Sequence, residues 1–557
     1  MVSLALVAAA CSRAGTASGG RGTFRMAIDQ PATLDPPLAS SGSESLLVKA
    51  LFDGLVSYDP TTEAVMPDVA TSWDVNPANT VFTFHLRTDA RFSDGERVTA
   101  ASFVRGMTRA LSPAIAAAPG SLSGELDGIA GAGDVTRGRA TTLSGARALG
   151  TDTLRIHLSA PDAEFLIRCG DTPFFPVPSP ATVADAQPSW ADSPVGDGPF
   201  ALAPTPAGGW LHSPSVVLVP NRHHPTPTPH VAEVVARVYP STWAGESAWD
   251  AGAVDWAPVV PTATAQVEAL GKKSFIEGPL GATAFLAVGL GALAPPTSSA
   301  AADVREAFSR AIDRPRIAAS VFGGSAAPAV GLVPPTVPGS ASTALASPTP
   351  GQQFPDQIVV APGPGAPCTA CAYDPAQARR LLAAARVALA GRFPLYYAAG
   401  VGEDAWMQAV AGDLRVTLGI DAQAVPVAVQ PRVALVRGEA AAAVQGPTPA
   451  GVAVDAVLRY PTPDAALARV AGTGGDLNLT GFSSPALDAS LAAARAITRP
   501  AARASAYTQA ERDALATLPV IPLFWPGGVR LARLARWSGL GMDPFGDPTL
   551  RTVALRG

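Results

Sequence analysis

Chemistry-bearing side chains are sparse in this chain of 557 residues, and none falls in an established catalytic pattern. The patterns G-x-S-x-G and H-E-x-x-H, and a G-x-G-x-x-G placed between a strand and a helix, do not occur. The stretch QVEALGKKS comes nearest to a phosphate-binding loop. Gln266 stands in place of its first glycine, however, and Lys273 in place of its magnesium-binding hydroxyl. We therefore expect no enzyme and no catalytic residues.

Three histidines gather in NRHHPTPTPH and are the best candidates for metal binding. Prolines separate His223 and His224 from His230, and the three lack both the i,i+4 spacing of a helical pair and a C-x-x-C partner. We expect an exposed loop here, with no metal site and no cofactor.

The cysteines number four: Cys11, Cys169, Cys368 and Cys371. They are too few for a disulfide scaffold, and they lack the second ligand pair of a structural zinc site. Cys169 is expected to be a lone buried thiol.

Composition narrows the class of protein further. The formal net charge is −5 and no basic run occurs, so the basic surface of a nucleic-acid-binding protein is missing. The stretch 278–301 has no charge, but its apolar core, 282–294, is shorter than the roughly 20 residues that span a bilayer. We expect a buried strand there.

The elements that must position a site follow from hydrophobic periodicity. TFRMAID alternates like a strand, and Phe82, Phe84 and Leu86 alternate with polar residues. Ser43 is expected to cap a helix that ends before Asp59-Pro60. Helices and strands alternate to the end of the chain, which predicts an α/β fold in several lobes.

Several stretches resemble, in order and spacing, the family 5 solute-binding proteins of ABC importers, the oligopeptide-, dipeptide- and nickel-binding group. They are TLDPPLASSGSESLLVKALFDGLVSYDP, PDVATSWDV, FTFHLRTDARFSDGERVTAASFV, VGDGPF, VREAFSRAIDRPRIAASVFGG, YDPAQARRLL and LPVIPLFW. Each stretch alone is common, but together they cover most of the chain from about residue 22 onward. The resemblance implies a class II periplasmic-binding fold, in which two α/β lobes joined by a hinge close around a ligand.

The resemblance also implies a domain organisation. We expect a lipoprotein signal segment at 1–11, a flexible tether at 12–22, a first-lobe core at 23–52, 195–285 and 505–557, an inserted subdomain at 53–194, and a second lobe at 286–504.

The ligand site is where this chain departs from the family. Peptide binders of the family pair an aspartate with the α-amino group of the ligand, and AVLRYPTPDAALARV carries Arg459 at that position. An arginine offers a planar donor fork to a carboxylate or phosphate, so the ligand would have an anionic or capped end. Two alternatives stay open: Asp464 replaces the aspartate, or Arg459 faces solvent. Aromatic side chains favour ligand clefts, and the candidates are Tyr397, Trp406, Tyr460 and Trp525.

If the protein is exported, the sequence also predicts how it is attached to the membrane and whether its cysteines are oxidised. Val2–Ala10 resembles the apolar core of a secretory signal, and AAAC resembles a lipoprotein processing site with Cys11 as the lipid-modified residue. No lysine or arginine precedes this run, which favours a start upstream of Met1. In an exported protein, Cys368 and Cys371 are expected to form a local disulfide, with free thiols as the alternative.

The sequence therefore predicts an extracytoplasmic, lipid-anchored, monomeric binding protein on the cell membrane. It would capture a peptide or peptide-like solute and deliver it to an ABC permease. The rival within binding proteins is a sensor that feeds a signalling partner. The rival from another class is a hydrolase on a similar scaffold, which would need a nucleophile and a base placed together in a cleft.

Overall fold

The computed structural model describes residues 22–556, apart from residues 61, 180–187, 205–209, 211, 213, 227–228, 342–365, 390, 428–441 and 443. Cys11 and the tether at 12–21 lie outside the described residues.

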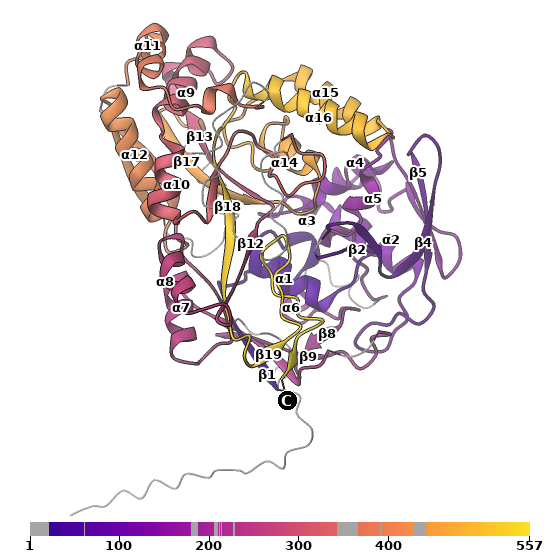
Figure 1. The fold of residues 1–557 in the computed structure, drawn as a ribbon. Helices are drawn as coiled ribbons and strands as arrows, with labels where there is room; N and C mark the ends of the chain where they lie inside the picture. The colour runs from indigo at the N-terminus through magenta and orange to yellow at the C-terminus, as the bar shows by residue number, and fades with distance from the viewer. Residues whose placement is uncertain are drawn as a thin grey trace, which may run out of the picture.

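A twelve-stranded sheet runs through the molecule and forms the framework of both lobes (Figure 1). The first-lobe strands, in spatial order, are β8 (Phe200–Leu202), β9 (Ser215–Pro220), β10 (Glu233–Val238), β1 (Thr23–Ile28), β11 (Trp256–Pro258) and β18 (Ile521–Ala532), with β12 (Phe275–Pro279) also paired to β18. The second-lobe strands are β16 (Asp421–Val427), β15 (Arg392–Ala398), β17 (Ala450–Val457) and β13 (Ala282–Gly289), and β14 (Ala326–Pro328) pairs with β18.

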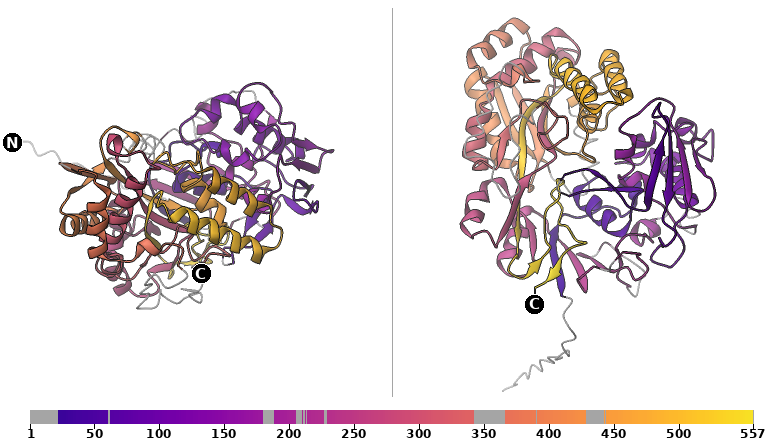
Figure 2. Two further views of the ribbon diagram at one scale, coloured as in Figure 1. Left: turned by 90° about the horizontal axis from the view of Figure 1, so that it is seen from above. Right: turned by 45° about the vertical axis from the view of Figure 1, so that its right-hand side comes forward.

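Strand β18 belongs to both lobes. Its first half pairs with β13 and β14, and its second half pairs with β12 and β11. In Figure 1 it runs down the middle of the molecule, and the right-hand view of Figure 2 shows the orange helices of the second lobe on one side of it and the indigo and purple N-terminal part of the chain on the other. The shared strand β18 and the short connection from β12 to β13 link the two lobes.

The segment between the first helix and β8 forms a separate unit. Its antiparallel sheet has the order β4 (Ala70–Val75), β5 (Val81–Leu86), β7 (Thr153–His157) and β6 (Ala146–Ala148), and β2 (Val56–Tyr58) pairs with β3 (Val65–Pro67). Phe82, Phe84 and Leu86 are buried, as their alternation predicts. We call this unit the inserted segment.

Helices cover the sheets. The first-lobe and inserted-segment helices are α1 (Gly42–Leu51), α2 (Ala100–Ala110), α3 (Pro113–Ala116), α4 (Ala132–Thr136), α5 (Phe165–Arg168), α6 (Pro188–Asp192), α7 (Thr242–Asp250) and α8 (Thr264–Ala269). The later ones are α9 (Ser299–Ala311), α10 (Arg314–Phe322), α11 (Pro375–Ala385), α12 (Asp404–Leu418), α14 (Pro463–Val470), α15 (Pro485–Ala496) and α16 (Pro500–Leu515). Strand β13 and helix α16 run across two of the expected lobe boundaries, and those boundaries stay a prediction.

Helix α1 begins at a different residue from the one the sequence predicts. Ser41, not Ser43, is the N-cap: its hydroxyl accepts a hydrogen bond from the Glu44 N–H, and the Glu44 carboxylate accepts one from the Ser41 N–H. This reciprocal capping box satisfies two backbone donors at once, which is why the helix starts there.

Strand β13 accounts for the apolar stretch near residue 282. All of its residues are buried, and it lies between β17 and β18. Among the described residues, no helix combines the length and the apolar character needed to cross a bilayer.

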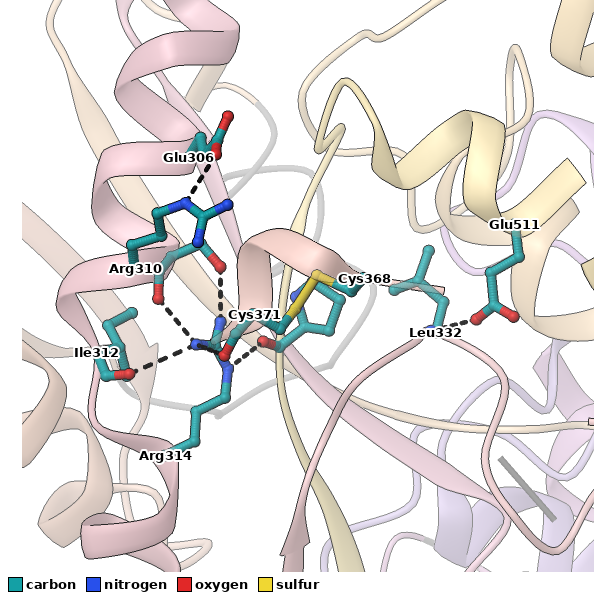
Figure 3. Close-up of a disulfide and its surroundings, with 10 residues drawn as sticks. Glu306, Arg310, Ile312, Arg314, Leu332, Cys368, Cys371 and Glu511 are labelled. Atoms are coloured by element: carbon teal, nitrogen blue, oxygen red, sulfur yellow. Dashed lines mark hydrogen bonds and ion pairs between the residues drawn. A yellow bond between two sulfur atoms is a disulfide. The ribbon is translucent and has the colours of Figure 1, made fainter. Parts of the chain in front are cut away.

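The structure joins Cys368 and Cys371 in a disulfide (Figure 3). The backbone around it is held from two sides, because Arg314 donates to the Cys371 carbonyl at 3.0 Å and the Cys368 N–H donates to Val330 at 2.9 Å. The disulfide thus fixes a turn beside the start of α10 and the strand β14. Cys169 is a buried free thiol.

Candidate functional site

A cavity of about 360 Å³ lies where the first lobe, the inserted segment and the second lobe meet. Its lining comes from α1, from β2 and the turn that follows it, and from the C-terminal segment 543–552; Pro461 extends it to the second lobe. This volume is in the range of sites that enclose small ligands.

The apolar walls of the cavity follow from local packing. Helix α1 buries Leu47, Val48 and Leu51 against the first-lobe core, and this turns Leu46, Lys49 and Ala50 toward the cavity. Phe52 and Phe175 stack with their ring centroids 6.3 Å apart, and both line it.

The polar lining is mostly acidic. Asp543 holds the C-terminal segment in a turn by accepting N–H bonds from Phe545 and Asp547, both at 2.9 Å. Burial, followed by the neighbouring charge of Asp543, raises the pKa of Asp547 well above its usual range. Burial likewise raises the pKa of Glu63 to about 7.

Two cations also line the cavity. The Lys49 ammonium lies 4.5 Å from the centroid of the Phe545 ring, a cation–π contact. Arg551 forms an ion pair with Asp53 and lies 3.8 Å from Asp68. Arg551 is therefore already neutralised within the protein.

Arg459 joins the two lobes beside this cavity. Its guanidinium makes two bonds of 2.7 Å to the two oxygens of Asp171, and it also donates to Thr172 Oγ1 at 3.0 Å and to the Ala39 carbonyl at 3.2 Å. Arg459 is 8% exposed, so it does not face solvent. Its donor fork, which would hold an anionic ligand end in one of the three interpretations left open by the sequence, is occupied by Asp171.

The two residues predicted near Arg459 also have protein partners. The Tyr460 hydroxyl donates to Glu125 at 2.9 Å, across the same junction between lobes. Asp464, in the first turn of α14, accepts a bond of 2.9 Å from Arg495.

The three aromatic candidates outside this segment lie in the cores. Trp406 packs edge-on against Phe524 with ring centroids 6.0 Å apart, and the Tyr397 hydroxyl donates to Asp404 at 3.0 Å. Trp525 is buried in a small apolar cluster around β14. None of the six predicted ligand residues lines the cavity.

Part of the polar lining, Asp543, Asp547 and Arg551, comes from a stretch that the sequence analysis did not single out. In DPFGDPTLRT, two carboxylates lie among proline and glycine, a pattern typical of turns. This proline and glycine pattern predicts a turn, but it does not predict that the turn packs against α1.

The expectation of an exposed loop is wrong at His224. This side chain is buried, with its Nε2 at 2.8 Å from Asp53 and its Nδ1 at 2.8 Å from Thr226 Oγ1. A hydroxyl, an imidazole and a carboxylate in series are the order of a nucleophile and its base. His224 and Thr226 do not line the cavity, and Asp53 is shared with Arg551, so the series ties the loop to the core.

Known proteins with related sequences are bacterial binding proteins. The chain is 32% identical over 197 residues to the periplasmic murein peptide-binding protein MppA of Escherichia coli, which covers 35% of each protein. It is 38% identical over 130 residues to the periplasmic oligopeptide-binding protein OppA of the same organism, which covers 23% of each. These alignments thus span about a third of the relatives or less.

The likeness in fold extends over nearly the whole chain. The structure of the E. coli murein tripeptide-binding protein MppA superposes with a TM-score of 0.76 at 24% identity, and covers 96% of this chain and 98% of that one. OppA of Burkholderia pseudomallei superposes with a TM-score of 0.78 at 21% identity, and covers 97% and 100%. The two-lobed class II fold predicted from the sequence is confirmed.

The model of the bacterial extracellular solute-binding proteins, family 5, matches residues 64–476. Because this match covers well over half of a chain that also has the two-lobed fold, the chain belongs to the family 5 bacterial extracellular solute-binding proteins.

Proposed function

We propose that the chain is an extracytoplasmic binding protein that captures a peptide or peptide-like solute between its lobes and delivers it to an ABC import permease. The observation that carries the proposal is the cavity at the junction of the two lobes and the inserted segment. The names of the relatives support the ligand class, since MppA and OppA are described as binding murein peptide and oligopeptides. One structural neighbour, OppA of Haemophilus influenzae, is a complex with the peptide RPPGFSPFR.

The mechanism is binding with closure and involves no covalent step. Pro461 of the second lobe lines the cavity together with first-lobe residues, and Arg459 and Tyr460, just before it, bond across the same junction. Hinge closure around a ligand is an established class of motion, and here β18 would supply the connection. A closed pair of lobes would present one composite surface to the permease.

Cys11 is proposed to carry the lipid anchor, with residues 12–22 as a tether to β1. A lipoprotein cysteine carries more than one acyl chain, and stable anchoring needs more than one. Replacement of Cys11 by serine should move the protein from the membrane fraction to the soluble extracytoplasmic fraction. We propose that the anchored protein is a monomer.

The ligand class is tested by thermal unfolding with a panel of peptides and of other solutes. A ligand that binds only the folded state raises the melting temperature, by an amount that grows with ligand concentration over Kd. Mass spectrometry of the material that co-purifies with the protein should then show a peptide. If peptides of two to nine residues give no shift and another solute class does, the peptide assignment is wrong.

A further inference from the structure

The inserted segment and the second lobe are joined by side-chain bonds rather than by a shared sheet. In the part of the chain that the structure describes, the strands of these two units belong to separate sheets. Arg459 and Tyr460 of the second lobe bond to Asp171 and Glu125 of the inserted segment. Hinge motion of rigid lobes is an established class of motion, and a contact of this kind can separate without breaking a sheet.

Glu164 is the acid at a second part of this contact, where α15 and α16 lie beside α5 (Figure 1). It comes just before α5 and is 4% exposed. The Tyr507 hydroxyl donates to its Oε2 at 3.0 Å, and Arg503 Nε donates to its Oε1 at 3.3 Å. Both donors lie on α16, which packs in one hydrophobic core with α14 and β17 of the second lobe. The Ala163 N–H donates to the Arg495 carbonyl at 2.8 Å, so backbone also meets here.

Charged groups surround Glu164 from both sides of the contact. On the second lobe, Asp464 of α14 lies close enough to disfavour the ionised form of Glu164, although Asp464 itself accepts a bond of 2.9 Å from Arg495. On the inserted segment, Asp162 accepts the Glu164 N–H at 2.8 Å and forms an ion pair with Arg168. The Arg503 guanidinium, at the longer distance of 3.3 Å, is the cation that bonds directly to the Glu164 carboxylate.

Contact with the second lobe makes Glu164 a stronger base. Burial, followed by the charge of Asp464, raises the pKa of Glu164 from about 4.5 to about 7. Both causes depend on the second lobe, since α16 contacts the carboxylate and α14 carries Asp464. Glu125, which bonds to Tyr460, changes in the same direction: burial and then the charge of Asp171 raise its pKa.

We propose that closure of the second lobe onto the inserted segment takes up a proton at Glu164, so that the lobes close more readily at acidic than at alkaline pH. The inference goes beyond the proposed function and uses only its closing motion. A carboxyl group that is more basic in the closed form binds protons on closure at every pH between its open and closed pKa values, about 4.5 and about 7. The ratio of closed to open molecules therefore falls as the pH rises through this range.

Proton-coupled closure would set the pH at which the protein captures a solute. The apparent affinity for a solute that binds the closed form is lowered by the fraction of molecules that are not closed. An extracytoplasmic protein meets the pH of its surroundings directly, so the same solute would bind more tightly in acid.

Single-molecule FRET without added solute tests the proposal. The exposed residues Thr142, in the inserted segment, and Ala493, on α15, are replaced by cysteine and labelled in a chain that carries Cys11→Ser. Cys169 is buried, and Cys368 and Cys371 are joined, so these cysteines do not compete for the label. We expect the ratio of closed to open molecules to be about tenfold or more higher at pH 5 than at pH 8. An equal ratio at the two pH values would overturn the inference.

Glu164→Gln identifies the titrating group. The amide oxygen can still accept the Tyr507 hydroxyl, and the side chain cannot ionise, so the ratio should change less than threefold between pH 5 and pH 8. Asp421→Asn, on the exposed start of β16, is the control and should keep the full dependence. If Glu164→Gln keeps the full dependence as well, Glu164 is not the group that takes up the proton.

Two further variants separate titration from a merely structural role. Tyr507→Phe removes a hydrogen bond that favours the ionised Glu164, so the pH-dependent range should extend to higher pH. Asp464→Asn removes a like charge, so the range should end at lower pH. If neither variant moves the range, the inference is wrong.

The outcome is independent of the ligand class. If peptides bind and the ratio does not depend on pH, the proton coupling fails and the proposed function stands. If the ratio depends on pH as expected and peptides leave the melting temperature unchanged, the proton coupling stands and the proposed ligand class fails.

Discussion

At the scale of single residues, the contact between the second lobe and the inserted segment includes a buried ion pair between Arg459 and Asp171. Their side chains are 7% and 1% exposed, and the pair is bidentate. Removing two charges from water is costly, and an ion pair offsets that cost only with good geometry and further hydrogen bonds. Thr172 and Ala39 supply those bonds.

Removal of the Arg459 side chain should therefore strongly destabilise the folded chain. Arg459→Ala leaves the Asp171 charge buried without a partner, and we expect the free energy of unfolding to fall by about 3–5 kcal/mol. Urea denaturation measures it, and the double variant with Asp171→Ala should recover part of the loss. The exposed pair Arg139–Asp134 is the control, and Arg139→Ala should cost only about 0–1 kcal/mol. If Arg459→Ala lowers the free energy of unfolding no more than Arg139→Ala does, the buried ion pair does not stabilise the contact as proposed.

The sequence could show that Arg459 departs from the family pattern but not what it contacts. Its partner Asp171 is 288 residues away, and no local pattern links the two. The same holds for Glu63 and Asp547, which only the packing of a C-terminal turn against α1 and β2 brings to one cavity. Residue types were predictable, whereas long-range partners were not.

At the scale of elements, the turn VGDGPF is fixed by its approach to the end of α1. A Cβ atom at Gly196 would lie 1.9 Å from the Leu51 carbonyl oxygen, and one at Gly198 would lie 2.6 Å from the Leu51 carbonyl carbon. Only glycine permits backbone to pass this closely. The contact holds α1 against the start of β8, and both elements line the cavity.

Gly196→Ala should consequently disturb the cavity wall. Because the clash is with backbone, the backbone must shift, and we expect a loss of about 2–3 kcal/mol in the free energy of unfolding. Gly42→Ala is the matched control, since a Cβ at Gly42 meets no atom within 4 Å, and it should change stability by about 0.5 kcal/mol or less. Ligand affinity should weaken for Gly196→Ala alone. Equal stabilities of the two variants would show that the turn can relax.

Elements with strong periodicity were the predictable part of the fold. The strands β1 and β5, the buried strand β13 and the start of α11 at Asp374-Pro375 follow from alternation, run length and capping residues. The order of strands in the sheet did not follow, because β18 pairs with strands from both lobes that lie more than 200 residues before it. Such pairing depends on the whole chain.

At the scale of the whole molecule, buried carboxyl groups give stability an unusual dependence on pH. Burial raises the pKa of Glu403 and of Asp68 to about 8, and that of Glu164 to about 7. The folded chain then binds more protons than the unfolded chain between about pH 4.5 and pH 8. Stability therefore falls as pH rises through this window, the reverse of an acid held ionised by a partner.

Glu511 is a buried carboxyl group away from the cavity. Its replacement tests whether the free energy of unfolding falls as the pH rises. Its Oε1 accepts N–H bonds from Leu332 and Val333 at 2.6 and 3.0 Å, and burial raises its pKa to about 7 (Figure 3). Glu511→Gln keeps an amide oxygen for both bonds and removes the proton equilibrium. The wild-type chain loses stability between the unfolded pKa of about 4.5 and the folded value of about 7, so the variant should gain on it by about 2–3 kcal/mol from pH 5 to pH 8. Urea unfolding at both pH values measures this gain, with Asp421→Asn on the exposed start of β16 as a control substitution. A variant that tracks the wild type at both pH values would mean that Glu511 ionises as freely in the folded chain as in the unfolded one.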